Sequence, residues 1–397
     1  MADAAAPRQS RLLRWLAIAG AGALAACQTI VPRGPVVPPE RPPVARPAEP
    51  RPPVVAPGIP QDTERHRVAL LVPLSGPNAG VGRSIANATQ LALLDTGSPD
   101  VRITQYDTAT GAGAAAARAL AEGAQLILGP LLSEDVRVVT PLARARRVPV
   151  VSFSNDTGVA GNGAYLMGYT PAESIERVVE YARGRGVASF AGLVPAGLYG
   201  ERASTAFLRA VEGAGGQVVA LQTYPRSAGG VTQAATRLNA KAPFDAVLVA
   251  DGGATAAAAA PAVKRGSAGA RLLGTELWNA EASVATRPGL NGAWFASVGD
   301  GLYRQYAAKY RARFGTGPYR LSSLGYDAVL LTVRIARDWR MGAAFPEARL
   351  RDPDGFAGID GPFRFGRDGV AERALEVKEI RGGQTVTVSP APATFGR

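Results

Sequence analysis

The folded part of this chain opens with Val68-Ala-Leu-Leu-Val-Pro-Leu-Ser-Gly-Pro77. Five consecutive apolar residues that end at a proline are typical of a strand buried on both faces, as in a parallel sheet. The residues that follow, 82–95, place Ile85 and Leu91 on one face of a helix. A buried strand followed by such a helix predicts one β-α unit of an α/β protein.

The same alternation of strand and helix continues along the chain. Further strands are expected at 101–106, 126–128, 148–153, 189–194, 218–223, 246–250 and 271–274. Helices are expected at 114–122, 134–144, 171–183, 201–213 and 231–240, and an alanine-rich helix after 250. Longer helices near 302–314 and 322–340, then strands at 361–365 and 374–380, end the series. Repeated units of this kind imply doubly wound, mostly parallel sheets, and about 330 residues are enough for two lobes.

The only cysteine of the chain, Cys27, directly follows Leu24-Ala-Ala26. Three arginines precede an apolar run at 15–26, which is too short to span a bilayer but has the layout of a secretory signal. This arrangement resembles the bacterial lipobox, in which Cys27 becomes the lipid-modified N-terminus. The alternative is an ordinary signal peptide whose cleavage site contains a cysteine.

Residues 28–60 contain twelve prolines and few aliphatic side chains. Such a segment buries too little apolar surface to offset the entropy of ordering, so we expect a disordered tether with polyproline II character. It would hold a folded domain well away from a membrane. The alternative is a low-complexity remnant without that role.

The composition excludes several kinds of site. One cysteine and one histidine, His66, leave no thiolate or histidine metal cluster and no Ser-His-Asp triad, so neither a metal nor a catalytic residue is predicted. We expect His66 to be solvated at a domain edge. Gly80-Val-Gly82 lacks the third glycine of a dinucleotide fingerprint, so no cofactor is predicted. The net charge of +12 is spread without a basic, aromatic-rich run, which argues against nucleic acid as a partner.

Five segments, in order, resemble the type I periplasmic binding proteins of the leucine-binding group. They are 68–77, 128–133, 148–155, 199–201 before a helix, and Gly361-Pro-Phe-Arg-Phe-Gly366. With a lipobox and a proline-rich tether, the chain is similar to one subgroup, the penicillin-binding protein activator lipoproteins. That resemblance implies a two-lobed fold, an outer-membrane anchor facing the periplasm, and a peptidoglycan synthase as partner. Gln28 after the cysteine agrees with outer-membrane sorting.

The resemblance also implies a division of the chain. A signal peptide would occupy 1–26, the lipidated cysteine and tether 27–65, the binding-protein domain 66–390, and a tail 391–397. Within the domain, the first lobe would take about 66–170 and 299–343. The second lobe would take about 171–298 and 344–390. A capping box at Thr170-Pro-Ala-Glu173 is expected to start the helix at 171.

Polar residues that follow the expected strands mark a cleft, since ligands of open parallel sheets bind outside the carboxyl ends of the strands. These residues are Ser75, Asp107, Ser133, Ser154, Asp156, Tyr199, Asp251 and Glu276. By resemblance, Ser133, Ser154 and Asp156 fall where the family holds an amino-acid headgroup, and Tyr199 and Glu276 where the second lobe closes. Ser133 is equally suited to cap the helix that begins at 134. Phe153 and Asn155 stand where leucine binders have small residues.

Three classes of function therefore compete. The first is a non-catalytic lipoprotein that binds and activates a penicillin-binding protein. The second is the solute-binding protein of an ABC importer for a branched-chain amino acid or a similar small polar ligand. The third, an enzyme, lacks a nucleophile–base pair in the sequence and is not predicted.

Overall fold

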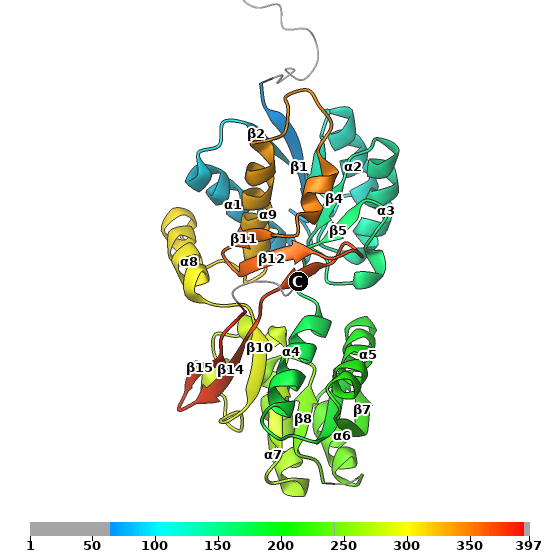
Figure 1. The fold of residues 1–397 in the computed structure, drawn as a ribbon, viewed down its shortest axis with the longest axis vertical. Helices are drawn as coiled ribbons and strands as arrows, with labels where there is room; N and C mark the ends of the chain where they lie inside the picture. The colour runs from blue at the N-terminus through cyan, green and yellow to red at the C-terminus, as the bar shows by residue number, and fades with distance from the viewer. Residues whose placement is uncertain (1–63, 242, 393–397) are drawn as a thin grey trace, which may run out of the picture. The chain divides into compact units, whose positions relative to one another are not determined.

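The computed structural model describes residues 64–392 except residue 242, and its first lobe contains a five-stranded parallel sheet. The strand order is β2-β1-β3-β4-β5. These strands are β1 (His66–Val72), β2 (Val101–Asp107), β3 (Leu126–Leu128), β4 (Val150–Ser152) and β5 (Ala164–Leu166). The helices α1 (Ala79–Thr96), α2 (Ala112–Ala121) and α3 (Ser133–Ala145) alternate with them (Figure 1).

Alternation along β1 decides which helices cover each face of this sheet. Leu70 and Val72 belong to the same core as Ile85 of α1 and Leu324 of α9 (Ser322–Ala336). Leu71 instead belongs to a core that includes Val136 of α3 and residues of α2. Both faces of the strand are covered, which explains its uninterrupted apolar sequence.

The second lobe has a seven-stranded sheet in the order β15-β14-β10-β9-β8-β6-β7. Its parallel strands are β6 (Ser189–Pro195), β7 (Gln217–Tyr224), β8 (Ala246–Val249), β9 (Arg271–Gly274) and β10 (Trp294–Ser297). The helices that alternate with them are α4 (Pro171–Arg183), α5 (Leu198–Gly213), α6 (Gly230–Asn239) and α7 (Gly253–Gly266). The predicted α/β fold with two mostly parallel, doubly wound sheets is confirmed.

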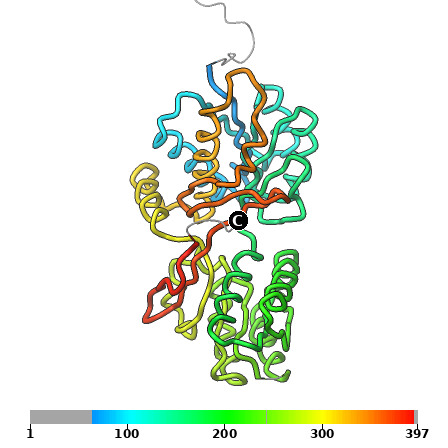
Figure 2. The backbone as a smooth tube through the Cα atoms, viewed as in Figure 1, coloured from blue at the N-terminus to red at the C-terminus, as the bar shows by residue number. Residues whose placement is uncertain are grey.

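The C-terminal segment departs from the predicted division of the lobes. Only the hairpin of β14 (Glu376–Arg381) and β15 (Gln384–Ser389) joins the second sheet, antiparallel to β10, as the red and yellow segments in Figure 2 show. Residues 350–371, expected in the second lobe, pack on the first. Phe356, Phe363 and Phe365 lie in the core of Leu70, because alternate apolar residues of their small antiparallel sheet face that core.

That small sheet consists of β11 (Phe356–Gly358), β12 (Gly361–Phe365) and β13 (Ala371–Arg373). The strand predicted at 374–380 is therefore a link followed by β14. Before this sheet come α8 (Gly301–Phe314), α9 and the 3-10 turn η4 (Glu347–Arg351). The chain thus passes between the lobes three times, at 167–170, 298–300 and 374–375.

Two local predictions are wrong. His66 is 1% exposed rather than solvated, because its ring stacks at 3.7 Å on Trp339, whose carbonyl lies 3.0 Å from His66 Nε2. The capping box does not form: the Thr170 hydroxyl donates to the Glu173 carboxylate at 3.3 Å and makes no bond to the helix backbone. Glu173 instead accepts a hydrogen bond from a distant strand.

Cys27 and the proline-rich tether lie outside the described residues. Within the part of the chain that the structure does describe, no helix combines the length and apolar character needed to cross a bilayer.

Candidate functional site

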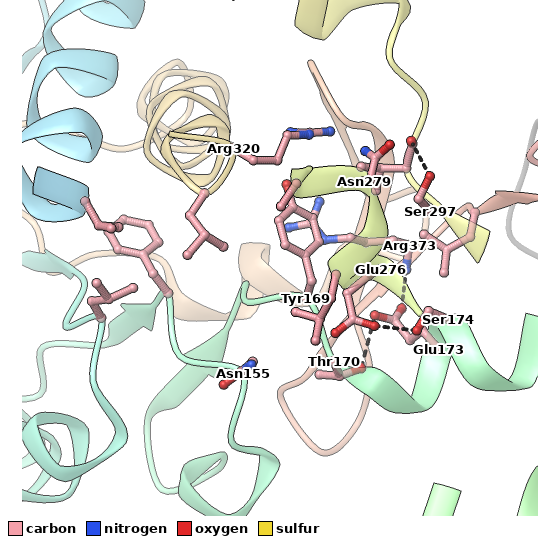
Figure 3. A pocket seen from close by; sticks show the side chains of 18 of the residues that line it. Asn155, Tyr169, Thr170, Glu173, Ser174, Glu276, Asn279, Ser297, Arg320 and Arg373 are labelled. Carbon is pink, nitrogen blue, oxygen red and sulfur yellow. Dashed lines mark hydrogen bonds between the residues drawn. The ribbon is translucent and has the colours of Figure 1, made fainter. Parts of the chain in front are cut away.

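A cavity of about 380 Å³ lies where the chain passes between the lobes (Figure 3). Its first-lobe wall includes the apolar side chains of Val81, Leu131, Leu132 and Phe153, together with Asn78 and Asn155. Its second-lobe wall carries polar groups, among them Glu276 after β9, Asn279, and Ser297 at the end of β10. The carboxyl ends of the parallel strands therefore line it, as the order of the sheets requires.

Two carboxyl groups lie together on the polar side. Glu276 accepts hydrogen bonds from the hydroxyls of Ser174 and of Tyr199, the latter at 3.0 Å. Glu173, next to Ser174 in the first turn of α4, accepts from the backbone N–H of Arg373 at 2.6 Å. Burial raises the pKa of Glu276, and it raises the pKa of Glu173 to about 7, although the charge of Arg373 opposes the latter shift.

Two arginines approach the cavity from the side of α9 and β13. Arg320 forms an ion pair with Asp360 at 2.7 Å, and its guanidinium lies 3.9 Å above the ring of Tyr303. Arg373 donates through Nη2 to the carbonyl of Met167 at 2.7 Å. Its guanidinium lies between the rings of Tyr169 and Phe363, at 5.0 and 5.1 Å from their centroids. Arg320 therefore has a carboxylate partner, whereas Nε and Nη1 of Arg373 are buried without a hydrogen-bond partner among the described residues.

The pKa values of the two buried acids behind these arginines are shifted in opposite directions. Burial alone would raise the pKa of Asp360, but the neighbouring Arg320 holds it below its ordinary value. Asp327, which accepts from the N–H of Ile359 at 2.7 Å, has its pKa raised to about 8 by burial and by the charge of Asp360. Asp360 is thus the stronger acid of the two and the ion-pair partner of Arg320.

Only one residue of the predicted site lines this cavity, and that residue is Glu276. Tyr199 lies directly behind it as a hydrogen-bond donor. The residues predicted to line the cavity from the first lobe do not line it. The Ser154 hydroxyl accepts from the N–H of Asp156 at 3.2 Å, and Ser133 is the first residue of α3 without capping it, since Leu132 holds the cap position.

Asp156 serves as a link between the lobes. Its carboxylate is 4% exposed and lies 2.8 Å from Arg137 of α3 and 3.1 Å from Arg202 of α5. It also accepts from the N–H of Gly158 at 3.0 Å. One first-lobe carboxylate therefore forms an ion pair with an arginine from each lobe.

The three remaining candidates, Ser75, Asp107 and Asp251, are also engaged locally. Ser75 donates to Asp107 at 2.6 Å, in the turn after β1. Asp251 accepts from the Tyr224 hydroxyl at 3.0 Å and pairs with Arg226 at 3.4 Å. None of these three side chains lines the cavity.

Sequence reasoning missed Glu173, Arg320 and Arg373 as cavity residues. Glu173 stood in a motif that was interpreted as a helix cap. Arg320 and Arg373 come from segments that carry no binding motif, and they reach the cavity only because α9 and β13 fold back on the first lobe. Among the described residues, no group of histidine, cysteine, aspartate and glutamate side chains is arranged to hold a metal ion.

Comparisons with solved structures agree with this architecture. A Rhodospirillum rubrum protein described as a branched-chain amino acid ABC transporter superposes with a TM-score of 0.73, at 21% identity over 82% of this chain and all of that one. Full-length LpoA from Haemophilus influenzae superposes with a TM-score of 0.64, at 19% identity over 83% of this chain and 60% of that one. At these identities the likeness concerns the fold.

Comparisons of sequence give the family. An uncharacterised Rickettsia prowazekii protein, RP748, is 28% identical over 139 residues, a match that spans 34% of this chain and 37% of the relative. A family model described as periplasmic binding protein matches residues 66–384. The chain therefore belongs to the periplasmic binding protein family.

Proposed function

We propose that this protein is a non-catalytic, lipid-anchored module that faces the periplasm and regulates peptidoglycan synthesis by binding and activating a penicillin-binding protein. The observation that supports it most is the first-lobe wall of the cavity. Ser133, Ser154 and Asp156, the positions expected to hold an amino-acid headgroup, are turned away or paired. Leu131, Leu132 and Phe153 face the cavity in their place.

Two further features support a regulator rather than an importer receptor. Asp156 pairs with Arg137 of the first lobe and with Arg202 of the second, and this link would have to break whenever the lobes opened to release a solute. The lipobox at Cys27 and the proline-rich segment suit a domain that must reach a partner at a distance from its own membrane.

The test pairs two measurements on the mature protein. Affinity capture with a membrane-bound glycosyltransferase–transpeptidase should recover a complex and raise the rate of glycan synthesis. Leucine, isoleucine and valine should leave the melting temperature unchanged, whereas a true ligand at a hundredfold excess over Kd would add about 2.7 kcal/mol of stability. Replacing Cys27 by serine should release the protein from the membrane fraction or leave unprocessed precursor.

The second candidate is a solute-binding protein for a small polar ligand, and the cavity with its buried carboxyl groups favours it. A reproducible stabilisation by a branched-chain amino acid, abolished when Ser154 and Glu276 are both replaced by alanine, would replace the activator proposal with this one. Failure to capture any synthase, together with such a shift, would establish the same conclusion.

A further inference from the structure

The outer face of α3 exposes apolar side chains at the edge of the first lobe, beside α2 (Figure 1). Val138 and Leu142, one helical turn apart, are 51% and 39% exposed. The exposed residues Pro141 and Ala145 lie on the same face of the helix, and we call these four residues the α3 strip. The strip borders α2, since a Cβ added to Gly113 would lie 3.1 Å from Val138 Cγ1 and 4.0 Å from Leu142 Cδ1.

Charges of opposite sign flank the α3 strip at its two ends. Glu134 stands in the first turn of α3, and Arg146 and Arg147 directly follow its last residue. All three side chains are exposed, and within residues 64–392 none of them forms an ion pair. The helix dipole favours this order of signs, but twelve residues at about 1.5 Å each separate the acid from the first arginine, so they cannot pair within one chain.

The centre of these charges coincides with the centre of the α3 strip. Thr140 lies midway between Glu134 and Arg146, and it also lies midway between Val138 and Leu142. When a second α3 packs antiparallel about that point, Glu134 of each copy faces Arg146 of the other. Val138 of each copy then faces Leu142 of the other. A single twofold axis generates all of these contacts, whereas parallel packing of the two helices would bring like charges together.

We propose that the outer face of α3 binds a second copy of this chain, in an antiparallel contact with a twofold axis near Thr140. The apolar strip supplies the attraction, because its side chains leave water in the contact. The charge pairs at the two ends fix the register and the orientation of the copies. One helix face is a small interface, so we expect reversible association rather than a permanent dimer. The contact uses neither the cavity nor a synthase.

Cysteine cross-linking in cells that express the full-length chain locates the contact. Pro141→Cys places a thiol beside the proposed axis, so oxidation with copper phenanthroline should give a covalent dimer on a non-reducing gel. Leu208→Cys, at a 45% exposed position of α5, should give at least about tenfold less dimer, because nothing holds two copies of it within disulfide distance. The parent chain, whose only cysteine is Cys27, measures the background from that residue.

Changes added to the Pro141→Cys chain test the apolar strip. Leu142→Asp should lower the yield of dimer about tenfold, because a charge in an apolar contact loses its water. Leu208→Asp, the same change at the control position, should leave the yield unchanged. The melting temperature of each variant shows whether it folds as the parent does.

Charge reversals in the same chain test the antiparallel register. Glu134→Arg should lower the yield of dimer, because it places like charges opposite each other at both ends of the contact. Adding Arg146→Glu and Arg147→Glu to that variant should restore the yield, since opposite charges then face each other again. The rescue separates a contact between two copies from a loss of folding.

The proposal is overturned if Pro141→Cys gives no more dimer than Leu208→Cys, or if Leu142→Asp leaves the yield unchanged. It is also overturned if Glu134→Cys cross-links to itself as readily as Pro141→Cys, because the antiparallel register separates the two copies of residue 134 by about 18 Å. Loss of synthase capture by Leu142→Asp, in a chain that does not cross-link at residue 141, would assign the face to the synthase instead. Capture by the parent chain is measured without oxidation, so the two proposals fail independently.

Discussion

Asp156 shows how one side chain can join two lobes. Replacing it by asparagine removes the charge from its bonds to Arg137 and Arg202, both of which are about half exposed. We expect Asp156→Asn to lower the free energy of unfolding by about 1–3 kcal/mol, since hydrogen bonds to charged groups are strong but partly screened here. Denaturant titration measures this loss. Asp354→Asn, at an exposed position, should stay within about 0.5 kcal/mol of the parent, and equal losses in both variants would refute the link.

Glu173 makes the stability of the folded chain depend on pH. Its pKa rises from 4.5 to about 7 on folding, chiefly through burial. Between these values the folded chain keeps a proton that the unfolded chain has released, so this group lowers stability as the pH rises from about 4.5 to about 7. Glu173→Gln stays neutral throughout, and we expect its melting temperature to fall less over that range than that of the parent. Glu212→Gln should show the parent's slope, and a Glu173→Gln profile parallel to the parent's would contradict the prediction.

The site residues illustrate which side chains the sequence could predict. Glu276 follows a clear strand, so the rule that ligands gather at strand ends found it. Ser133 and Ser154 also follow strands, but the direction of a side chain in a loop depends on hydrogen bonds that no local pattern encodes. Arg373 could not be predicted as a cavity residue for a different reason. It reaches the cavity through the packing of β13, and it lies 200 residues after Glu173, which accepts its backbone N–H.

In each lobe, one turn from a strand to a helix contains the same kind of close contact, between a helix glycine and the carbonyl oxygen of a proline. A Cβ added to Gly82 of α1 would lie 1.8 Å from the carbonyl oxygen of Pro73, and one added to Gly200 of α5 would lie 1.6 Å from that of Pro195. Each proline stands at or just after the end of the preceding strand. The helix can approach its strand this closely only without a side chain at the glycine.

Replacing glycine by alanine should therefore have opposite effects on stability at two positions of α5. Gly200→Ala should destabilise the protein by about 1–3 kcal/mol, because the helix must shift away from Pro195. Gly213→Ala, at the last position of the same helix with nothing near the new Cβ, should stabilise by up to about 1 kcal/mol. Thermal unfolding of both variants measures this difference. Equal effects would mean that helix propensity, rather than the contact with Pro195, governs the turn.

The sequence predicted a strand or helix wherever that element carries its own periodic pattern of apolar residues. The strands and helices from β1 to β9 were predicted in order, except for the short strand β5, because each of the others carries a local apolar pattern. The assignment of β11–β13 to a lobe was wrong. Phe363 and Phe365 alternate in the same way whichever sheet they cover, so periodicity alone does not choose the partner core.

For the whole molecule, neither lobe is complete in one continuous stretch. Val377 and Ile380 of β14 are at most 1% exposed and belong to the two cores of the second lobe. A fragment of residues 171–297 lacks β14, so β10 has no partner on one side and the second lobe lacks both core residues. We therefore expect this fragment to unfold without a cooperative transition. The same fragment joined through a flexible linker to residues 374–392 should unfold cooperatively. Equal cooperativity of the two fragments, followed by circular dichroism on heating, would contradict this dependence.

The three passages of the chain between lobes also order the events of its synthesis. When residues 171–297 have been synthesised, the first lobe still lacks α9 and β11–β13. The second sheet is then still without β14, which is synthesised after all of these elements. The first core can close only after residues 356–371 have emerged, and the second only after residues 377–380. The order of folding therefore does not follow the order of the lobes along the chain.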